Sequence, residues 1–383
     1  MKRIIASLSI IALAVMTLGP VLTVANETVT TGLTKGSGGG SSPIIKVKWE
    51  MLDLKGGAPG VGEEGKDDSP DPGAQFLAPG TWDGQLKYTV CAIATDPNSV
   101  LDIDGVYAEI YYPAGRAYSE DPAHPDVLGK PDTESPGVGA CGAFIEQNTL
   151  IKLGKAEGYE LFCNQIKNKN NNLPVFYDSY NYGEICAADG ELMKETAYVY
   201  CDDKTLKWED PAGLYKVVAY AQDKAGNFSN FLENYFEYLA LTGFEKDFTN
   251  VDYGEVLLST PKKISGNLIW SDGTPTIRNI GNTRLKMKVA QDDMDFGKTS
   301  GNWNISYDAR VGTDEADWQI YDPFGYKGAT PISTDYTQLE DTLELSEIEE
   351  MDFSVHVEKW LLPSEYTGTM WLAADMASFR TCK

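Results

Sequence analysis

The chain has 383 residues, and its 57 acidic against 32 basic side chains give a formal net charge of −25. Because nucleic-acid binding needs a basic surface for the phosphates, this charge argues against DNA or RNA as a partner. The length predicts about two or three domains. The content of 42% hydrophobic residues, with 21 Tyr and 8 Trp, suits β structure. An acidic surface is usually just solvated; the alternatives are attraction for divalent cations and repulsion between neighbouring copies.

The N-terminus predicts export. Two basic residues precede the apolar run Ile4–Leu18, and small residues permit cleavage after Ala25, which is the pattern of a secretory signal peptide over residues 1–25. The alternative is a retained anchor, because Ile4–Val24 is just long enough to span a bilayer. Residues 26–43 are rich in Gly and Ser and predict a flexible linker. We expect a secreted or cell-surface protein without a membrane span after signal cleavage.

Six cysteines fit an oxidising compartment and are candidates for disulfides. They are Cys91, Cys141, Cys163, Cys186, Cys201 and Cys382. No two of them have the C-x-x-C spacing of zinc or thioredoxin-type sites. Either Cys382 reaches back to the first domain, or one cysteine is left unpaired and can cross-link chains. The N-x-[ST] pattern also offers three glycosylation candidates, Asn26, Asn227 and Asn304.

The first domain is expected over residues 44–240. Pro43–Met51, Leu86–Thr95 and Gly105–Tyr112 read as strands with alternating or continuous apolar residues. The connection between the second and third strands carries four oxygen-bearing side chains, Asp96, Asn98, Asp102 and Asp104. They lack the EF-hand pattern, so a turn with solvated acids is favoured and calcium is the alternative. No other cofactor is predicted.

An insertion of loop and helix is expected around residues 113–196. Within it Cys141–Gln147 reads as a strand, and Thr149–Lys169 changes to a helical period. The stretch Val175–Tyr182 then holds four aromatic residues. Aromatic side chains of this kind, Tyr177 and Tyr180 above all, can contact a sugar or a protein partner. The favoured interpretation is that the cluster covers a small core beside a disulfide.

The stretch Ala212–Asn230 is the clearest strand. Its residues Tyr215, Val217, Ala219 and Ala221 share one face, and the turn Asp223–Asn227 follows. With PIIKVKWEM, ATDP and DGVYAEIYYP earlier in the chain, GLYKVVAYAQDKAGNFSN resembles secreted proteins of methanogen-type archaea. That family has no assigned function. The resemblance implies a surface location and an immunoglobulin-like (Ig-like) β-sandwich, and it implies no catalytic residue.

A second Ig-like sandwich is expected over residues 241–383. Val251–Val256 and Ile277–Thr283 are similar to a pattern of Ig-like modules in surface proteins. In the strand that follows, alternation predicts that Leu285, Met287 and Val289 face inward while Arg284, Lys286 and Lys288 face outward. We expect this basic row either to be solvated or to dock on an acidic segment of another copy, Glu340–Asp352 or Glu63–Asp71.

No motif of a nucleophile, phosphate or metal-protease site is present. His356, Ser354 and Glu358 share one strand face, and we interpret them as an exposed polar row. The sequence therefore predicts a mainly β, non-enzymatic cell-surface structural protein, a subunit of an extracellular layer, sheath or filament. The first alternative is an adhesin or a carbohydrate- or protein-binding module, and the second is a secreted hydrolase.

Overall fold

The computed structural model describes residues 40–52, 73–114, 116–117, 142, 144–169, 173–299, 302–312, 330–332, 334–359 and 365–381. Gly40–Lys383 forms one compact unit. The predicted signal peptide, most of the linker, the Glu63–Asp71 segment, Asn26, Cys141 and Cys382 lie outside the described residues. Within the described ranges no helix is long and apolar enough to cross a bilayer.

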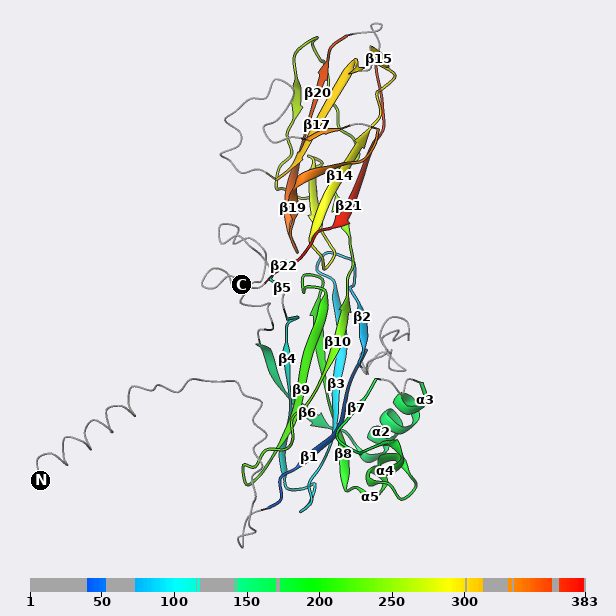
Figure 1. The fold of residues 1–383 in the computed structure, drawn as a ribbon, viewed down its shortest axis with the longest axis vertical. Coiled ribbons are helices and arrows are strands. Elements are labelled where there is room, and N and C mark those ends of the chain that lie inside the picture. Colours follow the sequence, from blue (N-terminus) through cyan, green and yellow to red (C-terminus); the bar gives the residue numbers. More distant parts are fainter. Residues whose placement is uncertain are drawn as a thin grey trace, which may run out of the picture. The chain divides into compact units, whose positions relative to one another are not determined.

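A nine-stranded sheet organises the residues before Leu241 (Figure 1). Its strands, in spatial order, are β2 (Gln75–Leu77), β10 (Leu232–Leu239), β9 (Gly213–Asp223), β4 (Ile103–Tyr111), β6 (Phe144–Lys152), β8 (Ala197–Lys207), β3 (Gln85–Thr95), β1 (Ile44–Leu52) and β7 (Val175–Phe176). Among the strand pairs that the structure describes in this sheet, only β2 and β10 are parallel. The sheet curls, because β1 and β10 lie near its opposite ends and yet the Asn230 side chain bonds the backbone N and O of Ile45. The result is a sandwich-like layer pair around one core.

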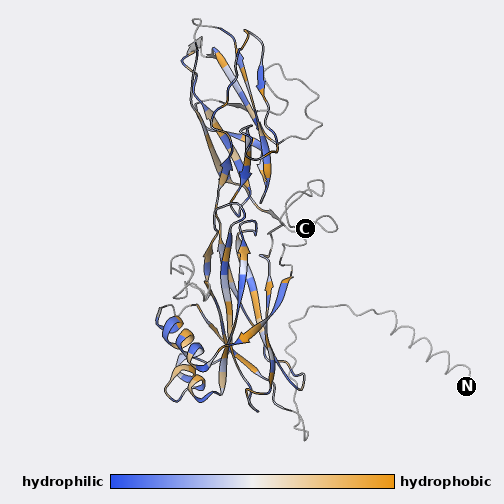
Figure 2. Cartoon of the chain, turned by 180° about the vertical axis from the view of Figure 1, so that it is seen from behind, coloured by the Kyte–Doolittle hydropathy of each residue, from blue (hydrophilic) through white to orange (hydrophobic). Residues whose placement is uncertain are grey.

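The face of strand β9 that its alternation predicts to point inward is buried. Tyr215, Val217, Ala219 and Ala221 are completely buried. The opposite face is mixed, because Leu214 is 55% exposed whereas Val218 and Tyr220 are buried. Hydrophobic and hydrophilic residues also alternate along many other strands (Figure 2). After β9 the chain turns at Gly226, whose φ of 86° favours glycine. The predicted strand-and-turn unit is therefore present.

Strand β1 differs from a half-buried strand, because both of its faces are covered. On one face Trp49 packs against Phe162, with ring centroids 5.0 Å apart. On the other face Lys48 and Glu50 are 0% exposed. The covering helical segment comprises α2 (Lys155–Tyr159), η3 (Glu160–Ile166), α3 (Lys167–Lys169), α4 (Tyr182–Cys186) and α5 (Glu191–Lys194).

The helical part of the predicted insertion begins later in the structure than the predicted start at Thr149. Strand β6 continues to Lys152, so Leu150 and Ile151 belong to a strand, and the helical residues begin at Lys155. Pairing of Ile151 with Cys201 extends the strand and overrides the local apolar spacing. The helices themselves are short, and the Cys163–Cys186 disulfide joins η3 to α4.

The residues after Leu241 form a second core between two sheets. One sheet contains β11 (Phe244–Lys246), β13 (Thr276–Asn279), β20 (Ile348–Val357), β17 (Ile305–Val311) and β18 (Thr330–Ile332), with β12 (Lys262–Ile264) also on β20. The other contains β19 (Thr337–Leu343), β14 (Leu285–Gln291) and β21 (Met370–Met376). As predicted, Leu285, Met287 and Val289 face inward and are 0% exposed.

Two small ladders complete the fold. One joins β15 (Lys298–Thr299) to β16 (Asn302–Trp303). The other joins β5 (Arg116–Ala117) to β22 (Arg380–Thr381), so the last described residues reach back to the first half of the chain. The division into two domains at residue 241 stays a prediction, although each side of that position has its own hydrophobic core.

Candidate functional site

Three carboxylates meet at one end of the nine-stranded sheet. Asp96 follows β3, Asp102 precedes β4, and Asp223 is the last residue of β9. One carboxylate oxygen of each lies within 4.8 Å of those of the other two. The structure thus brings together two of the four predicted metal ligands, Asp96 and Asp102, with a third acid, Asp223, which was predicted only to begin a turn.

The other two predicted ligands are not part of this group. Asn98 and Asp104 are both exposed. The Asn98 side chain donates from Nδ2 to the carbonyl oxygen of Ser41, at 3.1 Å. Asp104 lies on β4, two residues beyond Asp102 and outside the group of three.

Hydrogen bonds orient the carboxylates of the three-acid group. Asp96 Oδ1 accepts from the backbone N of Asn98 at 2.7 Å, whereas its Oδ2 is buried without a hydrogen-bond partner among the described residues. Asp96 as a whole is 5% exposed. Asp223 Oδ1 accepts from the backbone N of Ala225 at 2.9 Å and of Asn227 at 2.8 Å. Burial raises the pKa of Asp223, but the bonds from Asn227, Ala225 and Gly226 outweigh it and hold the pKa below its usual value.

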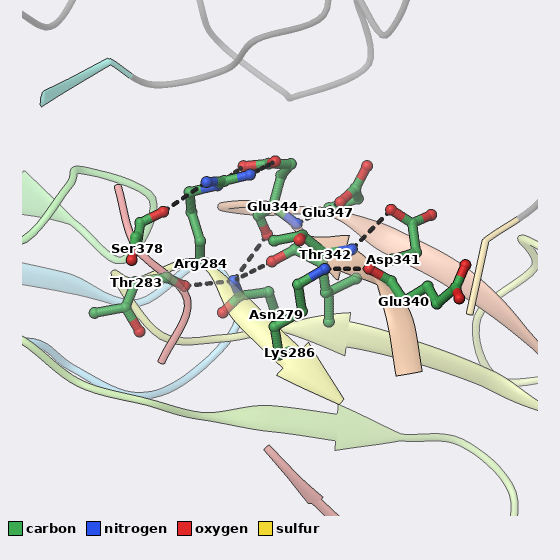
Figure 3. A network of polar contacts seen from close by, with 11 residues as sticks. Asn279, Thr283, Arg284, Lys286, Glu340, Asp341, Thr342, Glu344, Glu347 and Ser378 are labelled. Carbon is green, nitrogen blue, oxygen red and sulfur yellow. Dashed lines mark hydrogen bonds and ion pairs between the residues drawn. The ribbon is translucent and has the colours of Figure 1, made fainter. Parts of the chain in front are cut away.

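The basic row on β14 is engaged within the chain (Figure 3). Arg284 is only 7% exposed, so the prediction that it faces solvent is wrong. Its Nε and one terminal nitrogen donate to the two carboxylate oxygens of Glu344, each at 2.7 Å, and the other terminal nitrogen donates to Ser378 O at 2.6 Å. Lys286 Nζ donates to Glu340 O, and Lys288 forms an ion pair with Asp375. The partners Glu340 and Asp375 belong to the neighbouring strands β19 and β21, and Glu344 and Ser378 follow shortly after these strands, which is why the row is engaged.

The acidic segment Glu340–Asp352 is likewise used internally. Besides Glu344, Asp352 accepts from Arg310 Nε at 2.7 Å and is 0% exposed. Glu347 accepts from the backbone N of Glu344 and shares a hydrogen bond with Glu349. Burial and the Glu349 carboxylate raise the pKa of Glu347 to about 9, and burial raises the pKa of Glu349 to about 7.

This acid pair predicts a pH dependence. Because the pKa of Glu347 is raised by folding, its stabilising contribution is present below the ordinary glutamate pKa of about 4.3 and is lost as pH rises through the folded value. Raising the pH from about 5 to about 9 should therefore lower the thermal midpoint of the wild type more than that of Glu347→Gln. Calorimetry at both pH values tests this. Equal shifts in the two proteins would contradict the assignment.

The aromatic stretch mostly covers a core. Phe162 stacks on Tyr182 with centroids 5.1 Å apart, and Phe176 meets Tyr182 edge-on at 5.0 Å. Both contacts adjoin the Cys163–Cys186 disulfide, as the favoured interpretation expects. Of the two partner-contact candidates, Tyr177 is 39% exposed, while the ring of Tyr180 lies under Lys46 Nζ at 4.3 Å.

The row of His356 and Ser354 is not an exposed row, so that interpretation is wrong. His356 is 9% exposed and Ser354 is 0% exposed, whereas Glu358 is exposed. The cause is the central place of β20, whose residues lie directly opposite those of β17: Ser354 opposite Asp308, and His356 opposite Ser306. The Ser354 hydroxyl is 3.4 Å from Asp308 Oδ2.

Four predicted cysteines form disulfides, Cys91–Cys201 and Cys163–Cys186. Two of the predicted glycosylation candidates have their amide nitrogens engaged. Asn304 is 5% exposed and donates from Nδ2 to Phe296 O at 2.7 Å, and Asn227 donates from Nδ2 to Asp223 Oδ2 at 2.8 Å. Neither position presents a free side-chain amide in the folded chain.

Sequence reasoning missed a polar group in the first core. Lys48 Nζ lies 2.6 Å from Glu50 Oε1 and also donates to Asn234 Oδ1. Asn234 Nδ2 in turn donates to Glu50 Oε2 at 2.8 Å. Lys48 and Glu50 are 0% exposed and Asn234 is 6% exposed. The two strands that carry them, β1 and β10, lie far apart in the sequence, so no local pattern could reveal the group.

A cavity of about 1500 Å³ opens beside the second core. Its lining combines aromatic and aliphatic side chains with a few acids, and includes Phe248, Tyr253, Phe296, Tyr366 and Trp371. Phe296 and Tyr366 lie with ring centroids 4.2 Å apart. The lining also holds many polar side chains, such as Lys246, Asn250 and Asp252, and a concave site that combines apolar and polar groups can bind a ligand.

No protein-family model and no curated protein matches the chain. Among solved structures it is similar to a chain of a chaperone–tip adhesin complex of CFA/I fimbriae, at 9% identity and a TM-score of 0.24, over 90% of this chain and 93% of that one. It is also similar to a DUF4466 family protein from Parabacteroides merdae, at 8% identity and a TM-score of 0.19, over 82% of this chain and 99% of that one. At these TM-scores the likeness carries no argument.

Proposed function

We propose that the chain is a non-catalytic, exported structural protein of the cell surface, built from two Ig-like β-sandwich modules and acting as a subunit of an extracellular layer, sheath or filament. The observation that carries this proposal is the pair of disulfides inside a mainly β fold. Disulfides persist in oxidising compartments and are rare in cytosolic proteins.

The polar residues that could have served catalysis or docking support the same proposal. The side chains of Arg284, Asp352 and Ser354 all contact other side chains of the chain itself. They hold strands together and are not presented to a substrate. Assembly between copies therefore needs a surface other than the basic row of β14.

Sedimentation of the full chain, purified with its disulfides intact, tests the structural role. We expect assemblies that electron microscopy can resolve and that persist when Lys286 and Lys288 are both changed to Glu. Material that stays monomeric at every concentration and salt level would overturn the assembly part of the proposal.

The cavity favours a second candidate, a surface module that binds a carbohydrate or a protein. Trp371 lines it and is 43% exposed, so its ring is available for stacking. Under this alternative, Trp371→Ala abolishes saturable binding to a glycan or protein array, whereas Tyr177→Ala, at an exposed ring outside the cavity, does not. Binding lost only in Tyr177→Ala would place the contact on the aromatic stretch instead.

A further inference from the structure

The buried group of Lys48, Glu50 and Asn234 lies in an apolar interior. On β10, Asn234 shares its inward face with Leu232 and Phe236, which are buried as well. The residues paired directly with the group on neighbouring strands are Ala92 opposite Lys48, Val90 opposite Glu50, and Val217 opposite Asn234. These surroundings exclude water from a lysine, a carboxylate and an amide that contact one another.

The contacts bring a potential nucleophile, the Lys48 amine, next to a potential electrophile, the side-chain amide of Asn234. Lys48 Nζ contacts Asn234 Oδ1, which is bonded to the amide carbon Cγ. Glu50 touches both reacting nitrogens, because Oε1 is 2.6 Å from Lys48 Nζ and Oε2 is 2.8 Å from Asn234 Nδ2. A carboxylate within hydrogen-bond distance of both nitrogens can take a proton from one and give it to the other.

We propose that Lys48 and Asn234 form an intramolecular isopeptide bond, with Glu50 as the proton-transfer group. Glu50 takes a proton from the Lys48 ammonium, and the neutral amine attacks Asn234 Cγ. The new Nζ–Cγ bond forms and the Cγ–Nδ2 bond breaks. Glu50 returns protons to the departing nitrogen, which leaves as ammonium. Atoms and charge balance without an oxidant or any other reactant.

The environment favours the reactive form of the amine. Burial lowers the pKa of Lys48, and the nearby Glu50 and Glu233 carboxylates only partly oppose this effect. A lysine nucleophile is active only when neutral, and burial is a usual means of making it so. The same apolar packing holds the three side chains in place before the reaction.

The bond would close the curled sheet covalently. In the sequence, β1 is the first strand of the nine-stranded sheet and β10 is the last. The two reacting residues are 186 positions apart. A force that pulls the two ends of this module apart would then be carried by the covalent bond between β1 and β10, and the hydrogen bonds between the strands would not break. This property suits the proposed structural role but does not depend on it.

Peptide mapping of the full chain, expressed without glycosylation, tests the bond. Trypsin should not cut after Lys48, and a branched peptide should join residues 47–55 to residues 225–246. The intact reduced protein should be lighter than its sequence by one ammonia molecule. Two separate linear peptides at full mass, with cleavage after Lys48, would overturn the proposal.

Variants then assign the roles. Asn234→Ala and Lys48→Arg should abolish the branched peptide, and Glu50→Gln should abolish it or slow its formation. Asn230→Ala is the matched control, because this asparagine also bonds β1, through the Ile45 backbone, but lies outside the group. It should keep the ammonia deficit. An isopeptide bond that forms at an unchanged rate in Glu50→Gln would overturn the role of Glu50. If a variant fails to fold, the peptide map of the wild-type protein still shows whether the bond exists.

The three-acid group contains a carboxylate that is almost completely withdrawn from water. Asp96 Oδ2 is buried beside two other carboxylates and has no hydrogen-bond partner in the part of the chain that the structure describes. A buried, unpartnered carboxylate oxygen is costly unless a cation balances it. We infer that Asp96, Asp102 and Asp223 bind a calcium ion, because all three ligands are oxygens and calcium completes its six to eight oxygen ligands with carbonyls and water.

Calorimetry of the chelator-treated full chain tests the cation site. Added CaCl₂ should bind at one ion per chain and raise the thermal midpoint, and Asp102→Asn should weaken both effects. Asp104→Asn is the matched control, since this neighbour is exposed and outside the group. A midpoint that is the same in CaCl₂ and in chelator, or an equal loss in Asp104→Asn, would overturn the assignment. A response to MgCl₂ as strong as to CaCl₂ would overturn the choice of metal.

Discussion

Replacing Arg284 by alanine is expected to lower the free energy of unfolding by about 3–5 kcal/mol, because it leaves the Glu344 carboxylate without its cation. The two side chains are 9% and 11% exposed, and both hydrogen bonds between them are 2.7 Å long. Burying a charged group costs free energy unless an opposite charge is paired with it, so each of these two side chains is stable in its buried place only while the other is present. Urea unfolding followed by tryptophan fluorescence measures the change.

Two further variants make this result specific. Lys194→Ala removes an ion pair with Asp189 whose side chains are 59% and 86% exposed, and it should cost only about 0–1 kcal/mol. Arg284→Met combined with Glu344→Leu should recover most of the lost stability, since no charge is then left unpaired. An Arg284→Ala protein of unchanged stability that no longer assembles would instead restore the docking role predicted from the sequence.

Changing Cys91 and Cys201 together to alanine is expected to cost about 2–5 kcal/mol. The bond joins directly opposed residues of β3 and β8 across 110 residues of sequence, and both cysteines are buried. A cross-link over so long a loop restricts the unfolded chain strongly. Denaturant unfolding of the oxidised protein and the double variant measures the difference.

The second disulfide provides the comparison. Cys163–Cys186 spans only 23 residues, so the chain-entropy model predicts a smaller loss for the corresponding double alanine variant. An equal or larger loss at Cys163–Cys186 would contradict the entropic account. It would point to the packing of Phe162, Phe176 and Tyr182 beside that bond as the main contribution.

Local periodicity was sufficient to identify the apolar face of a strand. The alternation of β9 and of β14 predicted their inward residues correctly, because a period of two needs no knowledge of the partner strand. It was insufficient for β1, where the helical segment covers the apolar face of Trp49 and the opposite face is buried as well. Lys48 and Glu50 sit at positions that alternation assigns to the polar side, and only the curl of the sheet shows that this side is interior.

The candidate sites depend on contacts between distant residues. Asp96 and Asp102 are close in sequence and were predicted together, but Asp223 joins them only because β4 and β9 pair. Arg284 meets Glu344 across 60 positions, so its outward place in the pattern did not reveal that it is buried. Residue type and spacing can therefore identify candidate residues for such sites. The order of the strands in the sheet determines which of these residues come into contact.

Labelling of intact cells that produce the protein, with a membrane-impermeant amine reagent, tests whether the chain is an extracellular protein. We expect the protein to be labelled on intact cells, and Cys91, Cys163, Cys186 and Cys201 not to react with a thiol reagent without reductant. A protein labelled only after lysis, with Cys91 and Cys201 present as free thiols, would contradict an extracellular structural role.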